Sequence, residues 1–159
     1  MKISLCCVGK IKEKFYRDAI DEYGKRLSKY CKLEIFEVPD EKNPAGDSEG
    51  TIQRVMKKEG DAVLSLLKED AFVIALDIKG TMLDSPGLAK KLERLGVEGK
   101  SHIELIIGGS LGLHEEVLRR ADFRLSFSPM TFPHQLMRVI LLEQLYRSFK
   151  IINNEPYHK

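Results

Sequence analysis

The sequence has few of the features that mark secreted, membrane or metal-binding proteins. It contains only three cysteines in 159 residues, and their spacing matches no metal or redox motif: Cys6, Cys7 and Cys31. Its longest uninterrupted apolar run is the six residues 71–76, whereas a membrane helix needs about twenty. Residues 1–3 lead into a strand-like run without the apolar segment and cleavage site of a signal peptide. We therefore expect a cytoplasmic protein with buried thiols, no membrane segment and no metal site.

Recognisable phosphate-binding motifs are also missing. The glycine cluster Gly108-Gly109-Ser110-Leu111-Gly112 lacks the lysine of a Walker loop and the spacing of GxGxxG. Its glycines would let backbone N–H groups approach a ligand, but a tight strand-to-helix turn explains the same pattern. The chain also has no internal repeat, low-complexity tract or linker, so residues 1–159 are predicted to form a single domain.

Charge is nearly balanced overall, at +2, but it is unevenly spread. Residues 1–32 hold nine Lys or Arg against four acids, and residues 33–113 hold ten against fifteen. The basic segment 9–17, GKIKEKFYR, combines two aromatic residues with four cations: Lys10, Lys12, Lys14 and Arg17. This combination suits a nucleic-acid backbone. A solvated helix face is the alternative interpretation.

Short apolar runs alternate with segments of helical spacing along the chain. Continuous or alternating apolar patterns predict strands at residues 3–8, 33–38, 71–77, 103–107 and 123–127. Apolar residues three and four apart predict helices at 15–30, 52–67, 86–95, 114–121 and from 133 onward. The polar segment 39–50 is predicted to be a loop, with Ser48 as a helix cap. The alternation predicts an α/β fold with a mainly parallel sheet flanked by helices.

The segment FSPMTFP, residues 127–133, is predicted to be a stiff loop. Pro129 and Pro133 have a fixed φ, and each restricts the residue before it, Ser128 and Phe132. Such a loop loses little entropy when it binds a ligand. A simple turn with Thr131 as helix cap is an alternative that is compatible with ligand binding.

The helix after this loop is apolar on nearly every side. Its exceptions are Arg138, Glu143, Gln144 and Arg147. A helix of this kind is buried on two sides, and the second cover is most simply another subunit. We expect a homodimer through the 133–149 helix, in which a buried ion pair is the simplest role for the charged residues.

Three segments together resemble the RlmH (YbeA-like) family of the SPOUT superfamily. They are IIGGSLGL at 106–113, SPMTFPHQLMRVILLEQLYRSF at 128–149 and NNEPYHK at 153–159, and the resemblance extends back to ISLCCVGKIKE at 3–13. It implies a SPOUT-type fold with a C-terminal trefoil knot, a topology that is otherwise very rare. It also implies a homodimer that methylates N3 of a pseudouridine in large-subunit (23S) rRNA on the assembled ribosome, with S-adenosylmethionine as cofactor.

The resemblance also implies where the cofactor binds. The family's positions fall at the carboxyl ends of three predicted strands, where open α/β sheets bind ligands. They are Leu76, Gly108, Phe127, Ser128, Pro129, Met130, Thr131 and Phe132.

Methylation at N3 must also remove a proton, and no single base stands out in the sequence. The candidate catalytic residues are His134, which is otherwise an ordinary first-turn residue, Arg138, and the tail residues Tyr157 and His158, closing over the nucleotide from either subunit. Arg147 and the basic segment are expected to hold RNA.

Two other functions are compatible with parts of the sequence. A non-enzymatic RNA-binding dimer needs the basic segment but not the paired prolines or the glycine cluster. A small-nucleotide hydrolase needs a metal site or a phosphate loop, and the sequence offers neither.

Overall fold

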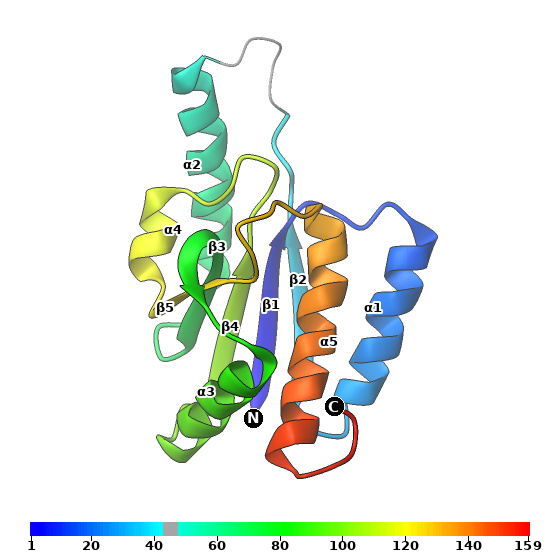
Figure 1. The fold of residues 1–159 in the computed structure, drawn as a ribbon. Helices are drawn as coiled ribbons and strands as arrows, with labels where there is room; N and C mark the ends of the chain where they lie inside the picture. Colours follow the sequence, from blue (N-terminus) through cyan, green and yellow to red (C-terminus); the bar gives the residue numbers. More distant parts are fainter. Residues whose placement is uncertain (43–47) are drawn as a thin grey trace.

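Strands and helices alternate along the whole chain in the computed structural model, which describes residues 1–42 and 48–159 (Figure 1). Within these residues the elements are β1 (Lys2–Val8), α1 (Lys14–Leu27), β2 (Lys32–Val38), α2 (Glu49–Leu66), β3 (Phe72–Met82), α3 (Ser85–Val97), β4 (His102–Ile107), α4 (Glu115–Arg120), β5 (Phe123–Ser126) and α5 (His134–Ile152). The predicted loop over 39–50 overlaps residues 43–47, which lie outside the described part. Ser48 caps α2 as predicted, because its side chain accepts a hydrogen bond from the Thr51 N–H at 3.3 Å.

In the described residues the strands form one five-stranded sheet in the order β2-β1-β4-β3-β5, and every pair is parallel. This confirms the predicted α/β class. Parallel strands with helical crossovers are covered on both faces, which explains the continuous apolar runs of β1 and β4. All carboxyl ends of the strands therefore lie along one edge of the sheet.

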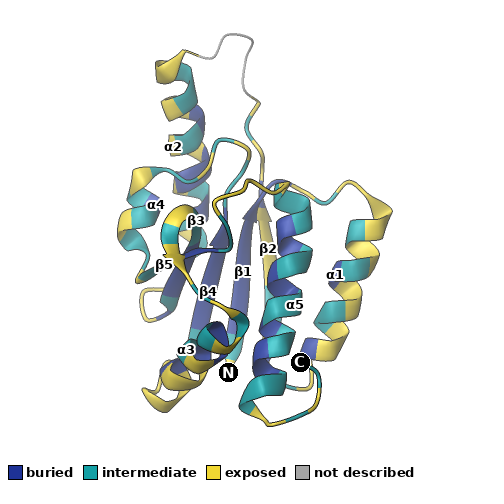
Figure 2. Cartoon of the chain, viewed as in Figure 1, coloured by how far each residue is buried: buried dark blue, intermediate teal, exposed yellow. Residues whose placement is uncertain are grey.

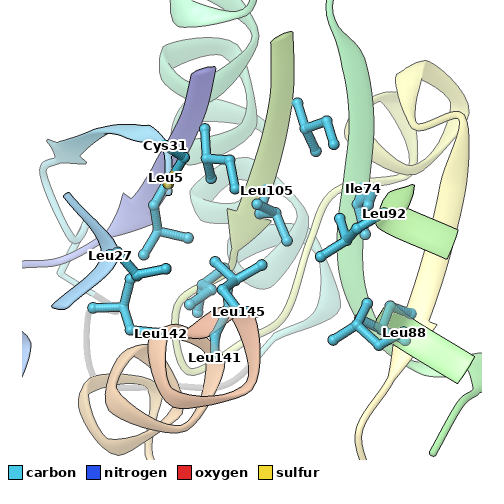
Figure 3. Close-up of a cluster of buried hydrophobic side chains, with 14 of the residues drawn as sticks. Leu5, Leu27, Cys31, Ile74, Leu88, Leu92, Leu105, Leu141, Leu142 and Leu145 are labelled. Carbon is cyan, nitrogen blue, oxygen red and sulfur yellow. The ribbon is translucent and has the colours of Figure 1, made fainter. Parts of the chain in front are cut away.

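The two faces of the sheet have separate apolar cores. Odd-numbered residues of β1 pack with α1, α3 and α5, around Leu92, Leu141 and Leu145 (Figure 3). Even-numbered residues of β1 pack with α2 and α4, around Val63 and Val117. Figure 2 shows buried residues concentrated on the central strands and on the inner sides of the helices. The protein is therefore a three-layer α/β/α structure.

Helix α5 lies on the sheet between α1 and α3 (Figure 1). Seven of its residues are buried: Met137, Arg138, Leu141, Leu142, Leu145, Ser148 and Phe149. The remaining apolar residues, including Leu136, Val139 and Ile140, are half-buried. One chain thus accounts for most of the apolar character of the helix, and a half-buried apolar strip remains at its surface.

Two predicted boundaries differ from the structure. Strand β3 continues to Met82 instead of ending at Asp77, because its pairing with β5 shifts register between Leu76 and Thr81. Gly80 permits this bulge, since a Cβ there would lie 2.6 Å from the Arg124 carbonyl oxygen. The cap of α5 is Pro133, with no side-chain hydrogen bond, and not Thr131.

The trefoil knot stays a prediction, because strand order does not define how the chain threads. Among the described residues, no helix has the length and apolar character needed to cross a membrane.

Candidate functional site

A cavity of about 310 Å³ lies at the carboxyl edge of the sheet. Its walls come from residues 76–78 at the bulge of β3, from the segments that follow β4 and β5, and from α4 and the first turn of α5. The volume is at the lower end of the range for small-molecule sites. Sheets of this class bind ligands at this edge, so the cavity is the candidate ligand site.

The cavity brings together nearly all of the predicted cofactor residues. Those that line it are Leu76, Gly108, Phe127, Ser128, Met130, Thr131 and Phe132. Pro129 is exposed and is not part of the wall. The residue-level prediction named only Leu76 and Gly108 from the first two strand ends, whereas Asp77 and the whole segment Gly108–Leu113 also line the cavity. These additional residues could have been predicted, because in the sequence they stand at the ends of apolar runs that predict buried strands.

Glycine is required in the wall that follows β4. A Cβ at Gly108 would lie 3.0 Å from the carbonyl carbon of Gly112 and 3.0 Å from Leu113 Cδ2. Gly112 has φ +85°, a left-handed conformation that favours glycine. The Gly112 N–H donates to the Gly109 carbonyl at 3.1 Å and closes the turn. The predicted turn and the predicted ligand wall are therefore the same segment.

Hydrogen bonds fix the loop between β5 and α5. The buried Ser126 hydroxyl donates to the Ile78 carbonyl at 3.1 Å, which ties the loop to the β3 bulge. The Ser128 hydroxyl accepts from the Met130 N–H at 2.9 Å. Met130 and Phe132 remain 73% and 36% exposed beside the cavity. Exposed apolar side chains around a cavity are suited to covering a ligand.

His134 lines the cavity and faces the end of β1 across Gly9. The Cβ position of Gly9 lies 3.3 Å from His134 Nε2 and 3.6 Å from Asp40 Cβ. Gly9 also has φ +90°, so a side chain there would be both strained and crowded. At this edge of the sheet, His134 and Asp40 therefore both lie next to the position that a side chain on Gly9 would take.

Arg138, a candidate catalytic residue, is 1% exposed and does not line the cavity. Its guanidinium donates to Glu37 at the end of β2, at 2.5 Å, and to the Gly9 carbonyl after β1. Its Nε is the one buried side-chain nitrogen or oxygen of the described residues that has no hydrogen-bond partner. In this structure Arg138 ties two strand ends to the start of α5 and does not face the site.

The basic segment lies beside the His134 end of the cavity. The Lys12 N–H donates to the Gln135 side chain at 3.1 Å, and the Ile11 N–H donates to Glu37 at 3.2 Å. The four predicted cations are all exposed: Lys10, Lys12, Lys14 and Arg17. Two of them have partners, since Lys14 pairs with Asp18 and Arg17 donates to the Ile11 carbonyl. Cation side chains therefore extend from a backbone that is held next to the cavity.

The C-terminal tail folds back onto its own α5, away from the cavity. The Tyr157 hydroxyl donates to Glu143 at 3.1 Å, and Arg147 contacts both Glu143 and His158 Nδ1, at 2.6 and 3.2 Å. Glu143 lies nine residues along the helix from His134, about 14 Å at 1.5 Å per residue. Figure 1 shows the C-terminus toward the same end of the molecule as the N-terminus, opposite the carboxyl ends of the strands. Within one chain, Tyr157, His158 and Arg147 do not join the site.

Comparison with known proteins identifies the family of this fold and site. The family model described as "Predicted SPOUT methyltransferase" matches residues 1–158. The chain belongs to the SPOUT methyltransferase family. This agrees with the family expected from the glycine cluster, the paired prolines and the C-terminal motif.

Full-length relatives and a solved structure support this assignment. Proteins named ribosomal RNA large subunit methyltransferase H, from Bifidobacterium adolescentis and Clostridium novyi, are 60% and 58% identical over 159 residues, covering all of both chains. A probable methylase family protein from Haemophilus influenzae matches 99% of this chain and 70% of its own, with a TM-score of 0.53 and 14% identity. At that identity, the structural likeness supports the fold alone.

Glu59 is a residue at this edge that the sequence analysis did not select. It comes from α2, is 4% exposed and accepts the Glu41 N–H at 3.2 Å. A Cβ at Gly109, in the cavity wall, would lie 3.3 Å from Glu59 Oε2. The available signal was helical spacing, since Val55, Glu59 and Val63 follow one another at four-residue intervals and all three are buried.

Burial and the neighbouring acid make Glu59 hard to ionise. Desolvation is the largest cause, and the hydrogen bond and negative charge of Asp40 add to it. Together they raise the Glu59 pKa to about 7, while the Glu41 N–H opposes them. Burial likewise raises the pKa of the free thiols, to about 12 for Cys6 and Cys7 and about 11 for Cys31. Within residues 1–42 and 48–159, no group of three or more His, Cys, Asp or Glu is placed to hold a metal ion.

The raised Glu59 pKa predicts how stability depends on pH. Between about pH 4.5, its ordinary pKa, and about pH 7, the folded protein binds more protons than the unfolded chain. The contribution of Glu59 to stability is therefore complete below pH 4.5 and is lost as the pH rises through 7. Glu59→Gln should remove this loss, which is on the order of 3 kcal/mol at most.

Urea unfolding of wild type and Glu59→Gln across this pH range checks the prediction. Asp61→Asn is the matched control, because Asp61 lies on the exposed side of the same helix and pairs with Lys57 at 2.7 Å. The control should keep the wild-type dependence on pH. Parallel curves for wild type and Glu59→Gln would show that Glu59 does not have a raised pKa.

Proposed function

We propose that this protein is an S-adenosylmethionine-dependent methyltransferase that modifies N3 of a pseudouridine in large-subunit (23S) rRNA on the assembled ribosome, in the cytoplasm. The observation that carries the proposal is the cavity at the carboxyl edge, in a chain that matches the SPOUT methyltransferase model over residues 1–158. The names of the full-length relatives support ribosomal RNA of the large subunit as the substrate. The exposed basic segment beside the cavity supports an RNA partner.

The cavity suits the proposed cofactor. Leu76, Leu125 and Phe127 offer apolar wall for an adenine ring, and backbone groups of Gly108 and the 127–132 loop are available to bond its polar edge. Gly108 and Gly109 leave no room for a side chain, since a Cβ at either would lie 3.0–3.1 Å from protein atoms, and this lets the wall pack closely behind the cavity. S-adenosylmethionine, when bound, supplies a methyl group activated by a sulfonium. The fixed loop holds its shape before binding, which lowers the entropy cost of binding.

The protein's own residues have two tasks in this reaction. Positioning the acceptor nitrogen in line with the methyl group supplies up to roughly 7–11 kcal/mol of the barrier in favourable cases. His134, the titratable imidazole in the cavity wall, is placed to contact the acceptor base as an anchor or proton acceptor. Lys10, Lys12, Lys14 and Arg17 would hold the surrounding RNA backbone.

We further propose that the tail acts at the cavity of a second subunit. Tyr157 and His158 lie far from His134 within one chain, so a catalytic role requires their delivery by a partner. The half-buried apolar strip of α5, with Leu136, Val139 and Ile140, supports a homodimer through the 133–149 helix. Arg147, which contacts His158, would travel with the tail and help to hold the RNA. Arg138 would support the site through Gly9 and Glu37.

Methyl transfer from labelled S-adenosylmethionine tests the proposed function. The substrates are assembled ribosomes, isolated large subunits and free rRNA from cells that lack this gene, and the labelled nucleoside is identified by mass spectrometry. We expect label on N3 of a pseudouridine in assembled ribosomes, and little on free rRNA, because the small basic surface needs the shape of the ribosome for selectivity. RNA binding without any label would favour the non-enzymatic RNA-binding dimer.

The double variant Tyr157→Ala, His158→Ala tests the role of the tail. It should lower the rate of methyl transfer by about 10²-fold or more while cofactor binding, measured by calorimetry, stays at the wild-type level. Lys159→Ala, at the exposed end of the same tail, is the control and should keep the wild-type rate. An unchanged rate in the double variant would exclude a catalytic role for the tail.

A further inference from the structure

The cavity wall contains one acid and no basic side chain other than an imidazole. Among the described residues that line the cavity there is no lysine, arginine or glutamate, and Asp77 is the single aspartate. The other polar side chains of the wall are three hydroxyl groups and one imidazole: Ser110, Ser128, Thr131 and His134. With the imidazole neutral, the wall therefore has a formal negative charge that comes from Asp77 alone.

The surroundings of Asp77 leave much of this charge available to a ligand. Asp77 is the first residue of the β3 bulge, directly after Leu76, and its side chain is 14% exposed. Its Oδ1 accepts the Lys79 N–H at 3.2 Å. Arg124 on β5 approaches Oδ2 only to 3.6 Å, which is too long for a hydrogen bond, and the Arg124 side chain is 53% exposed. This loose pair neutralises Asp77 in part, because an exposed cation is screened by water.

A cavity with this charge favours a cationic ligand and opposes an anionic one. S-adenosylmethionine carries a sulfonium and an ammonium group against one carboxylate, so its net charge is positive. Loss of the methyl group converts the sulfonium into a neutral thioether, and the spent molecule, S-adenosylhomocysteine, has no net charge. The same wall opposes the phosphate groups that a small-nucleotide hydrolase has to bind. Asp77 is therefore able to distinguish the methyl donor from the product by charge.

We propose that Asp77 makes the cavity selective for the charged methyl donor over S-adenosylhomocysteine. The inference rests on the proposed function. As the bond between the acceptor nitrogen and the methyl group forms, the sulfur–methyl bond breaks and its electron pair stays on sulfur. The N–H proton of the acceptor leaves to water or to His134, and the positive charge at sulfur disappears. The attraction between Asp77 and the bound molecule falls at this step, which favours release of the product.

The test has to separate the charge of Asp77 from its hydrogen bond in the β3 bulge. Asp77→Asn does so, because asparagine keeps the side-chain oxygen that accepts the Lys79 N–H and loses the charge. Arg124→Gln is the complementary variant, since it removes the cation that partly neutralises Asp77. Asp21→Asn is the control, because Asp21 is an exposed acid on α1 and its loss changes the net charge of the protein by the same amount.

Calorimetric titration of the free protein measures the selectivity without any methyl transfer. The ligands are S-adenosylmethionine, S-adenosylhomocysteine and sinefungin, an analogue with an ammonium group near the position of the sulfonium. Asp77→Asn should weaken the binding of both cationic ligands about tenfold and that of S-adenosylhomocysteine by less than about twofold. Arg124→Gln should strengthen the binding of the two cationic ligands and leave S-adenosylhomocysteine at the wild-type level. The control should bind all three ligands as the wild type does.

The pattern over the three ligands decides between the possible roles of Asp77. Equal weakening of S-adenosylmethionine and S-adenosylhomocysteine by Asp77→Asn would assign Asp77 to the ammonium group that both share, and would overturn the proposed selectivity. Unchanged binding of all three would leave Asp77 with its role in the bulge alone. Should Asp77→Asn fail to fold, Arg124→Gln decides, since equal changes for donor and product would also overturn the proposal.

Failure of the proposed function gives a different result. Wild-type protein that binds none of the three ligands would overturn the proposed cofactor and this inference together. Wild-type protein that binds S-adenosylmethionine, with an unchanged ratio of the two dissociation constants in Asp77→Asn, would overturn the inference alone.

Discussion

Burial of α5 against the sheet fixes the geometry on which the rest of the site depends. Leu141, Leu142 and Leu145 are completely buried against strand residues and neighbouring helices, so the helix has one position on the sheet (Figure 3). That position determines where the 127–133 loop must enter the helix, and so it closes one side of the cavity. Arg138 extends the same contact to the ends of β1 and β2 through Gly9 and Glu37. These hydrogen bonds hold the start of α5, with His134, next to the basic segment that follows β1.

Much of this architecture follows from local sequence pattern. The continuous apolar runs at residues 3–8 and 71–77 predicted buried strands, and the glycine cluster and paired prolines predicted where the chain would turn. The strand order β2-β1-β4-β3-β5 depends on long-range pairing, which periodicity does not encode. The β3 bulge was missed because Ile78–Met82 contains a glycine and a lysine and has no strand pattern. Its cause is contact with β5, which lies far away in the sequence.

The candidate site was predictable where it consists of backbone and loops, and less so where it depends on side-chain burial. Strand-end position located the cofactor segments, apart from Pro129, which faces outward. From the sequence alone, an arginine on an apolar helix is equally compatible with binding the substrate and with a buried structural role. Only the packing of Arg138 in the structure distinguishes these two roles. Glu59 stands in the polar run KKEGD, which predicts exposure to solvent. Its helical spacing with Val55 and Val63, however, puts it on the buried side of α2. The folding of the tail onto α5 depends on aromatic and ionic contacts that have no sequence period.

The central claim is that the cavity between the β3 bulge and the ends of β4 and β5 holds S-adenosylmethionine. A crystal structure of the protein with this molecule, supported by calorimetric titration, tests it most directly. The account predicts saturable binding, with the ligand in contact with Leu76, Gly108 and the 127–132 loop. An absence of binding, or binding at the separate cavity between Leu83 and Gln144, would contradict it.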